Sequence, residues 1–97
     1  MDKLVYLNSL YDLYGVLLTD KQQKYFEEYY FNNLSYGEIA LKYKISRNAC
    51  FKQLKNIEEK LEDYEKKLKI LYKKNKINVI IKKIGNKKIS QELENLF

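Results

Sequence analysis

The chain has 97 residues and a formal net charge of +6, with one cysteine, three glycines and no proline. That length fits one small domain with a short extension, and a single cysteine excludes an internal disulfide framework and indicates a reducing compartment. No apolar run approaches the roughly 20 residues that a transmembrane helix needs, and the N-terminus lacks the basic and apolar regions of a signal peptide, so we expect a cytoplasmic protein.

Two helices are predicted in the first third of the chain. Apolar residues at helical spacing predict a helix over residues 3–14, ended by Gly15. Thr19 and Gln22 form the capping box of a second helix, which reaches about Phe31. The charged side chains of this second helix are expected to face solvent: Lys21, Lys24, Glu27 and Glu28.

A short third helix and a long fourth helix follow. A second capping box, Ser35 with Glu38, begins the third helix, which is predicted to run through Tyr43. After a turn, Ser46 caps a fourth helix that is predicted to run from Arg47 to about Tyr72.

The fourth helix carries the a/d spacing of a coiled coil. Its apolar residues alternate three and four positions apart: Leu54, Ile57, Leu61, Tyr64, Leu68 and Leu71. A helix of this length is roughly 40 Å long and extends beyond a small domain, which leaves apolar surface to be covered. A second copy, the C-terminal segment folding back, or both would cover it. We predict a homodimer, with these dimerisation residues: Leu61, Tyr64, Leu68 and Leu71.

The C-terminal segment predicts a short helical arm. Residues 76–84 form an amphipathic pattern that ends at Gly85 and Asn86, and Ser90 is expected to cap a last turn or two through Phe97. β-Branched residues in 76–84 would also suit a strand, but no other segment could pair with it.

The predicted fold class is all-α, a helix-turn-helix (HTH) bundle with a long heptad-patterned helix and a short C-terminal helical arm. We predict an HTH domain over residues 1–60, with the HTH unit at 35–57. Residues 61–97 are predicted to form the extended dimerisation helix and a basic arm.

Residues 35–57 have the layout that an HTH requires. Ala40 is small, as the close crossing of two helices demands, and Cys50 is predicted to be a small core residue of the second helix rather than a redox switch. Other inward positions are apolar: Ile39, Tyr43, Ile45 and Leu54. Lys44 stands where glycine is usual, so it needs a left-handed conformation or a different turn.

The outward positions of this unit are cationic. Ser46 caps the second helix, whose first-turn amides and positive dipole end can then meet a phosphate, and residues 35–57 carry five basic residues against one acid. We predict nucleic-acid binding by the outward residues Lys42, Lys44, Ser46, Arg47, Asn48, Phe51, Lys52 and Lys55. An ordinary helical hairpin without nucleic-acid binding is the alternative.

The charge excess lies in the C-terminal third. Residues 1–65 carry nine Lys/Arg and eleven Asp/Glu, whereas residues 66–97 carry ten lysines and two glutamates. The lysines suit a phosphate-binding arm, but a solvated helix face or the compositional drift of an AT-rich genome explains them as well.

The sequence gives limited support for aromatic stacking on RNA and none for catalysis. Most of the ten tyrosines sit at core spacing, and the better candidates for stacking on unpaired bases are Tyr36 and Phe51. The chain has no histidine, no Cys/His cluster and no glycine-rich phosphate loop, so we expect no enzyme activity, no metal and no cofactor.

Several runs of the sequence resemble the YlxM family of small bacterial HTH proteins, which are similar to sigma-70 region 4. The resemblance covers about residues 3–71, and its most distinctive run begins at Leu61. The runs are Leu18-Thr-Asp-Lys-Gln, Leu34-Ser-Tyr-Gly-Glu-Ile-Ala, Ile45-Ser-Arg-Asn-Ala and Leu61-Glu-Asp-Tyr-Glu-Lys-Lys-Leu. That family is encoded beside the genes of the signal recognition particle (SRP), which implies a role in that pathway through SRP RNA or its protein components.

Three functional hypotheses follow. The first is a dimeric HTH accessory or regulatory protein that binds structured RNA, through a combined surface of recognition helix and basic arm. The second is a DNA-binding transcriptional regulator, against which the single arginine, Arg47, is a faint argument because arginine is the commonest reader of guanine. The third is a protein–protein adaptor with a purely structural HTH.

Overall fold

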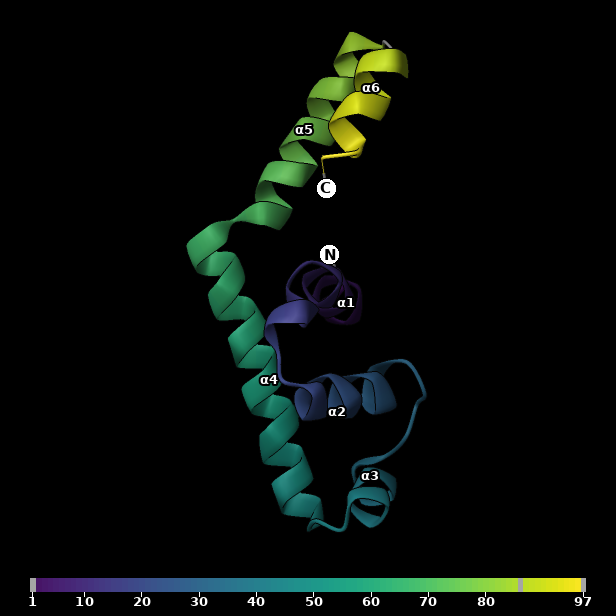
Figure 1. Cartoon of the computed structure of the whole chain (residues 1–97), viewed down its shortest axis with the longest axis vertical. Coiled ribbons are helices and arrows are strands. Elements are labelled where there is room, and N and C mark those ends of the chain that lie inside the picture. The colour runs from purple at the N-terminus through teal and green to yellow at the C-terminus, as the bar shows by residue number, and fades with distance from the viewer. Residues whose placement is uncertain (1, 86, 97) are drawn as a thin grey trace.

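The computed structural model describes residues 2–85 and 87–96, and within them the chain forms six α-helices, one 3₁₀ turn and no strand (Figure 1). The predicted all-α fold is confirmed. The elements are α1 (Lys3–Tyr14), η1 (Gly15–Leu17), α2 (Asp20–Tyr30), α3 (Tyr36–Tyr43), α4 (Arg47–Leu68), α5 (Ile70–Ile84) and α6 (Lys87–Glu94).

Side-chain caps stabilise the starts of four of these helices, and the first is Asp2, which accepts from the Leu4 N–H at the start of α1. Thr19 and Ser35 both complete the predicted capping boxes, and the Ser46 hydroxyl accepts from the Ala49 N–H at 3.0 Å. Each cap satisfies an amide that has no partner within its own helix. The predicted starts of α2, α3 and α4 are therefore confirmed.

Helix α4 is the longest helix, and α1, α2 and α3 pack against it (Figure 1). These four helices form the body of the molecule. Helices α1, α2 and α3 lie beside one another along α4. The most deeply buried side chains come from all four helices: Leu7, Leu10, Tyr14, Phe26, Ile39, Cys50, Ile57 and Leu61. The core of the body therefore lies against one apolar face of α4.

The prediction that α4 continues to Tyr72 is wrong. The helix ends at Leu68 because Lys69 adopts the left-handed conformation, with φ 53° and ψ 35°. Helix α5 starts directly afterwards at Ile70, six residues before its predicted start at residue 76. The chain therefore bends at a single non-glycine residue.

A hydrogen-bonded joint stabilises this bend. The Tyr14 hydroxyl donates to Glu65 Oε1 at 2.6 Å and accepts from the Ile70 N–H at 3.2 Å. The Glu65 carboxylate also accepts from the N–H groups of Leu71 at 3.0 Å and Tyr72 at 3.2 Å. Residue 69 supplies no side-chain cap for α5, so Tyr14 and Glu65 satisfy the first amides of that helix instead.

The chain itself covers most of the predicted dimerisation residues. Leu61 is fully buried, Leu71 is 9% exposed, and Tyr64 packs against the core with its ring centroid 5.9 Å from that of Tyr14. Leu68 alone among the four is exposed, at 45%. Homodimerisation stays a prediction, but most of the surface expected to need a partner already has one within the chain.

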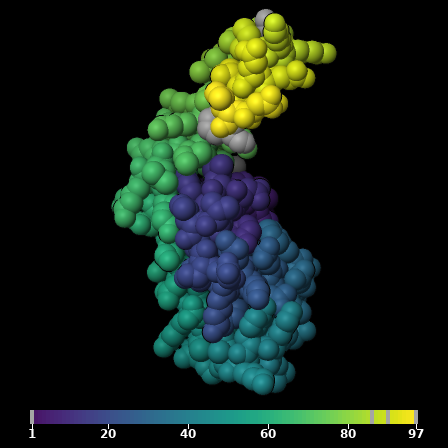
Figure 2. All heavy atoms as spheres, in the orientation of Figure 1, coloured from purple at the N-terminus to yellow at the C-terminus, as the bar shows by residue number. Residues whose placement is uncertain are grey.

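Helices α5 and α6 form a hairpin that extends beyond the body (Figure 2). The predicted domain boundary at residue 60 falls inside α4, and α6 begins at Lys87, before the cap expected at Ser90. Asn86, Phe97 and the side chain of Ser90 lie outside the described parts of the structure. In residues 2–85 and 87–96, no helix is both long and apolar enough to cross a membrane.

Candidate nucleic-acid interface

Helices α3 and α4 form the predicted HTH. Lys44 joins them in the left-handed conformation, with φ 57° and ψ 46°, as its place in the turn requires. Its N–H and that of Ile45 both donate to the Ala40 carbonyl, and α3 ends at Tyr43, as predicted. The two helices of the HTH and the corner between them are confirmed.

The inward side of the HTH is packed as predicted. Ile39 and Cys50 are fully buried, and Ala40 and Leu54 are nearly so. Burial raises the pKa of the Cys50 thiol, so this side chain stays a neutral core group. Sequence spacing alone was sufficient to identify these positions.

The outward side exposes every predicted nucleic-acid-binding residue. Ser46, Arg47 and Asn48 surround the N-terminal end of α4, and Lys52 and Lys55 continue along the same helix. Phe51 is 45% exposed among them, although it is a large apolar side chain. The helix dipole and these side chains together make the surface attractive to phosphate groups.

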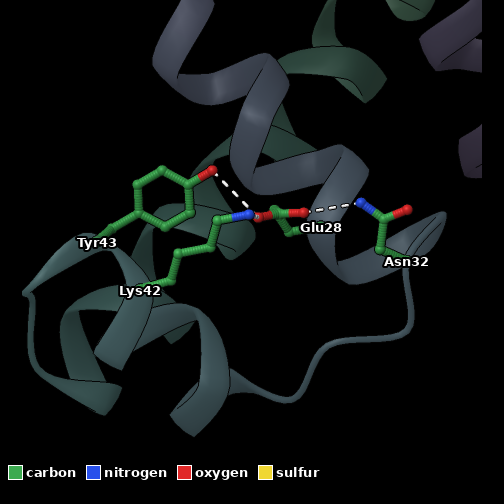
Figure 3. A network of polar contacts seen from close by, with 4 residues as sticks. All are labelled: Glu28, Asn32, Lys42 and Tyr43. Atoms are coloured by element: carbon green, nitrogen blue, oxygen red, sulfur yellow. Dashed lines mark hydrogen bonds and ion pairs between the residues drawn. The ribbon is translucent and has the colours of Figure 1, made fainter.

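Lys42 is tied to a neighbouring helix and differs in this from the α4 cations. It forms a short ion pair with Glu28 of α2, which also accepts from Asn32 Nδ2 at 2.7 Å and from the Tyr43 hydroxyl at 3.2 Å (Figure 3). The expectation that Glu28 faces solvent is wrong, because these donors stabilise it in a buried position. Hydrogen bonds from these donors, above all from Lys42, lower the pKa of the Glu28 carboxyl. This lysine therefore braces α3 against α2.

Two aromatic side chains form a corner beside the start of α4. The Tyr36 ring stacks on Tyr29, with centroids 5.0 Å apart and planes at 8°, and meets Phe51 at 5.6 Å and 79°. A hydrogen bond with Tyr29 and burial raise the pKa of Tyr36 to about 12, so its hydroxyl stays neutral. The two rings predicted to suit stacking are thus adjacent.

A surface pocket of about 400 Å³ opens at this corner, lined by Tyr36, Arg47, Asn48 and Phe51. A larger hollow of about 660 Å³ shares the same two rings and continues past Tyr29, Tyr30 and Lys3. The sequence singled out Tyr36 and Phe51 separately. It did not predict the pocket, because the pocket depends on how α3 crosses α4.

The basic arm does not join this surface. Helix α3 and the start of α4 lie at one end of the molecule, and α5 and α6 lie at the other (Figures 1 and 2). The longest dimension is 52 Å. The structure thus separates two basic regions that were predicted to form one combined surface.

The described residues contain no cluster of three or more His, Cys, Asp or Glu side chains that could hold a metal ion.

Comparison with known proteins identifies relatives over nearly the whole chain. The model of the family UPF0122, described as "Putative helix-turn-helix protein, YlxM / p13 like", matches residues 1–96. This match includes the C-terminal arm, which the sequence resemblance had left out.

Individual relatives agree with the family match. A UPF0122 protein of Halalkalibacterium halodurans is 42% identical over 84 residues, which cover 87% of this chain and 77% of the relative. A UPF0122 protein of Shouchella clausii is 45% identical over 73 residues, covering 75% and 67%. Another, of Caldanaerobacter subterraneus subsp. tengcongensis, is 45% identical over 83 residues, covering 86% and 71%.

Proposed function

Because the chain belongs to the UPF0122 family of YlxM- and p13-like helix-turn-helix proteins, we propose that it binds nucleic acid through the outer face of its HTH. The observation that carries this proposal is the arrangement of α4, which exposes Arg47, Lys52 and Lys55 while it buries Cys50 and Leu54. The protein acts as an accessory or regulatory factor and not as an enzyme.

Structured RNA is the proposed ligand, and SRP RNA is its first candidate. The resemblance to the YlxM family supports a role in the SRP pathway. A protein with that role is expected to act in the cytoplasm. The exposed cations suit phosphate binding by either nucleic acid. A DNA-binding regulator is the second candidate, since the exposed N-terminal end of α4 is the part of an HTH that enters a major groove.

A protein–protein adaptor is the third candidate, and the exposed apolar side chains of the bend and arm favour it. Leu68, Val79, Ile80 and Ile84 are each about half exposed. The same side chains support the proposed homodimer, because exposed apolar clusters mark surfaces that bind other proteins.

Competition binding separates the two nucleic acids. Labelled SRP RNA is bound to the protein and displaced by unlabelled SRP RNA, an unrelated structured RNA or duplex DNA, between about 50 and 200 mM salt. We expect SRP RNA to compete best at every salt concentration. Equal competition by duplex DNA would support the DNA-binding regulator.

Paired variants test the surface. Arg47→Ala with Lys52→Ala should weaken RNA binding about tenfold or more and reduce the slope of log affinity against log salt by about 0.9 for each lost phosphate contact. Lys21→Ala with Lys24→Ala is the matched control, because it removes the same charge from exposed positions on α2.

If partner binding survives the Arg47/Lys52 change but Leu68→Asp abolishes it, the adaptor hypothesis is correct. Leu68 suits this test because, unlike Leu61, it is exposed.

A further inference from the structure

The pocket at the α3–α4 corner has walls of two chemical kinds. Tyr36 and Phe51 supply aromatic rings, and Arg47 and Asn48 supply polar groups. Its volume of about 400 Å³ lies at the lower end of the range found for small-molecule sites, which begins at about 300 Å³. A single nucleobase is smaller than a typical drug and fits such a pocket.

The aromatic rings are arranged to receive a flat ligand. They meet at 79°, so a base that stacks on one ring has the other beside it. Tyr36 is fixed from behind by its stack on Tyr29, and Phe51 leaves 45% of its surface exposed. Stacking on such rings tolerates any base, because every base has a π-face.

The polar groups suit the edge of a base. The Asn48 amide offers both a donor and an acceptor, and the Arg47 guanidinium offers several donors. Unpaired bases expose Watson–Crick and Hoogsteen edges to side chains of this kind. A base within a continuous duplex is covered on both faces by its neighbours, so it cannot stack in the pocket.

The surrounding charge favours a nucleotide over an apolar peptide. Lys52 and Lys55 follow Arg47 along α4, and the adjoining hollow is lined by Lys3 and Lys55 against one carboxylate, Glu58. These cations can hold the phosphates on either side of a base in the pocket.

We infer that the pocket formed by Tyr36, Arg47, Asn48 and Phe51 binds one unpaired nucleobase of a structured RNA. This inference rests on the proposed function, since the same α4 surface binds the flanking phosphates. It adds a preference for RNA with a bulged or looped nucleotide over RNA that is fully paired.

Two RNA duplexes test this site: one is fully paired, and the other is identical except for a single bulged 2-aminopurine. The wild-type protein should bind the bulged duplex about tenfold more tightly and quench the 2-aminopurine fluorescence as the base stacks. Phe51→Leu should remove this preference and the quenching, so that it binds the two duplexes with similar affinity. Phe51→Tyr keeps the ring and should keep both.

A second double variant separates the pocket from the phosphate surface. Lys52→Ala with Lys55→Ala should weaken binding of both duplexes equally, because neither lysine is among the four residues that line this pocket, and Lys55 lines only the larger hollow beside it. If the wild-type protein binds both duplexes equally well, or Phe51→Leu weakens both alike, the base pocket is disproved while RNA binding by the HTH stands. If neither duplex binds, the proposed function fails and the base pocket fails with it.

Discussion

Lys44 shows how one residue sets the geometry of the HTH at a local energetic cost. Its left-handed backbone turns the chain from α3 into α4, and a non-glycine residue in that region is disfavoured by about 1–2 kcal/mol. The buried side chains on both sides of the turn, Ile39, Ala40 and Cys50, over-determine the conformation. The turn is thus maintained by packing and not by its own propensity.

Substitutions at position 44 should separate backbone strain from charge. Lys44→Gly should raise the free energy of unfolding by at most about 1 kcal/mol, because relief of the left-handed strain is offset by the greater freedom of glycine in the unfolded chain. Lys44→Val should lower it by about 1–2 kcal/mol, since a β-branched residue tolerates this region poorly. Urea denaturation measures both. Equal stability of the two variants would contradict the argument.

Glu28 should make the stability of the protein dependent on acid. Hydrogen bonding from Lys42 lowers the pKa of its carboxyl, so the ionised form stabilises the folded state. That contribution is complete above the ordinary carboxyl pKa of about 4.3 and is lost as the pH falls through the lowered folded value. Glu28→Gln should therefore lower the melting temperature at pH 7 and flatten the decline below about pH 4.3.

Thermal unfolding across the acid range checks this prediction, with Glu59→Gln as the control on an exposed carboxylate. The same melting temperature and acid dependence in wild type and Glu28→Gln would show that the buried cluster of Figure 3 contributes nothing to stability.

The residues whose roles were predicted correctly make contacts close by in the sequence. The residue whose role was predicted wrongly makes contacts far away in the sequence. Ser35 and Ser46 contact amides three positions away, so their roles could be predicted from spacing. Glu28 is buried because Lys42 and Tyr43, fourteen and fifteen residues further on, both reach it. No local sequence pattern predicts these contacts between α2 and α3.

At the level of elements, the joint between α4 and α5 was the main feature that the sequence did not predict. The heptad pattern runs without interruption through Leu68 and Leu71, and no glycine or proline marks the bend at Lys69. The break depends on Tyr14, which lies fifty-one residues before Glu65 and hydrogen-bonds to it. Periodicity identified which side of α4 is apolar. It could not tell that α1 and α5, rather than a second copy, cover part of that side.

Removing the joint should loosen α5 without unfolding the body. Tyr14→Phe keeps the buried ring and deletes the hydroxyl, so the free energy of unfolding should fall by about 1 kcal/mol. Glu65→Ala leaves the Leu71 and Tyr72 amides without their acceptor, and hydrogen exchange at these two amides should become faster. Glu62→Ala, on an exposed carboxylate of the same helix, should leave both exchange rates unchanged.

On the scale of the whole molecule, the structure is elongated. Its radius of gyration is 16.6 Å, whereas a compact domain of 100 residues has about 13 Å. The difference comes from the α5–α6 hairpin, which extends from the body (Figure 2). By sequence, this hairpin carries most of the excess lysines. The HTH and the arm are therefore two separate cationic regions on one molecule.

A charge-removing variant of the arm should show whether its lysines contact RNA. Replacing Lys73, Lys82, Lys83 and Lys87 by glutamine should reduce the salt slope of RNA binding by about 0.9 for each lysine that contacts a phosphate. All four are exposed. An unchanged slope would show that these four lysines make no phosphate contact.

The bend at Lys69 also sets the direction of the whole arm. Helix α5 has 15 residues and is about 22 Å long, so a rotation of about 15° at Lys69 moves its far end by about 6 Å. That displacement is close to two base-pair steps along a nucleic-acid helix, at about 3.4 Å each. The four hydrogen bonds made by Tyr14 and Glu65 thereby determine how far from the HTH, and in which direction, the lysines of the arm can reach.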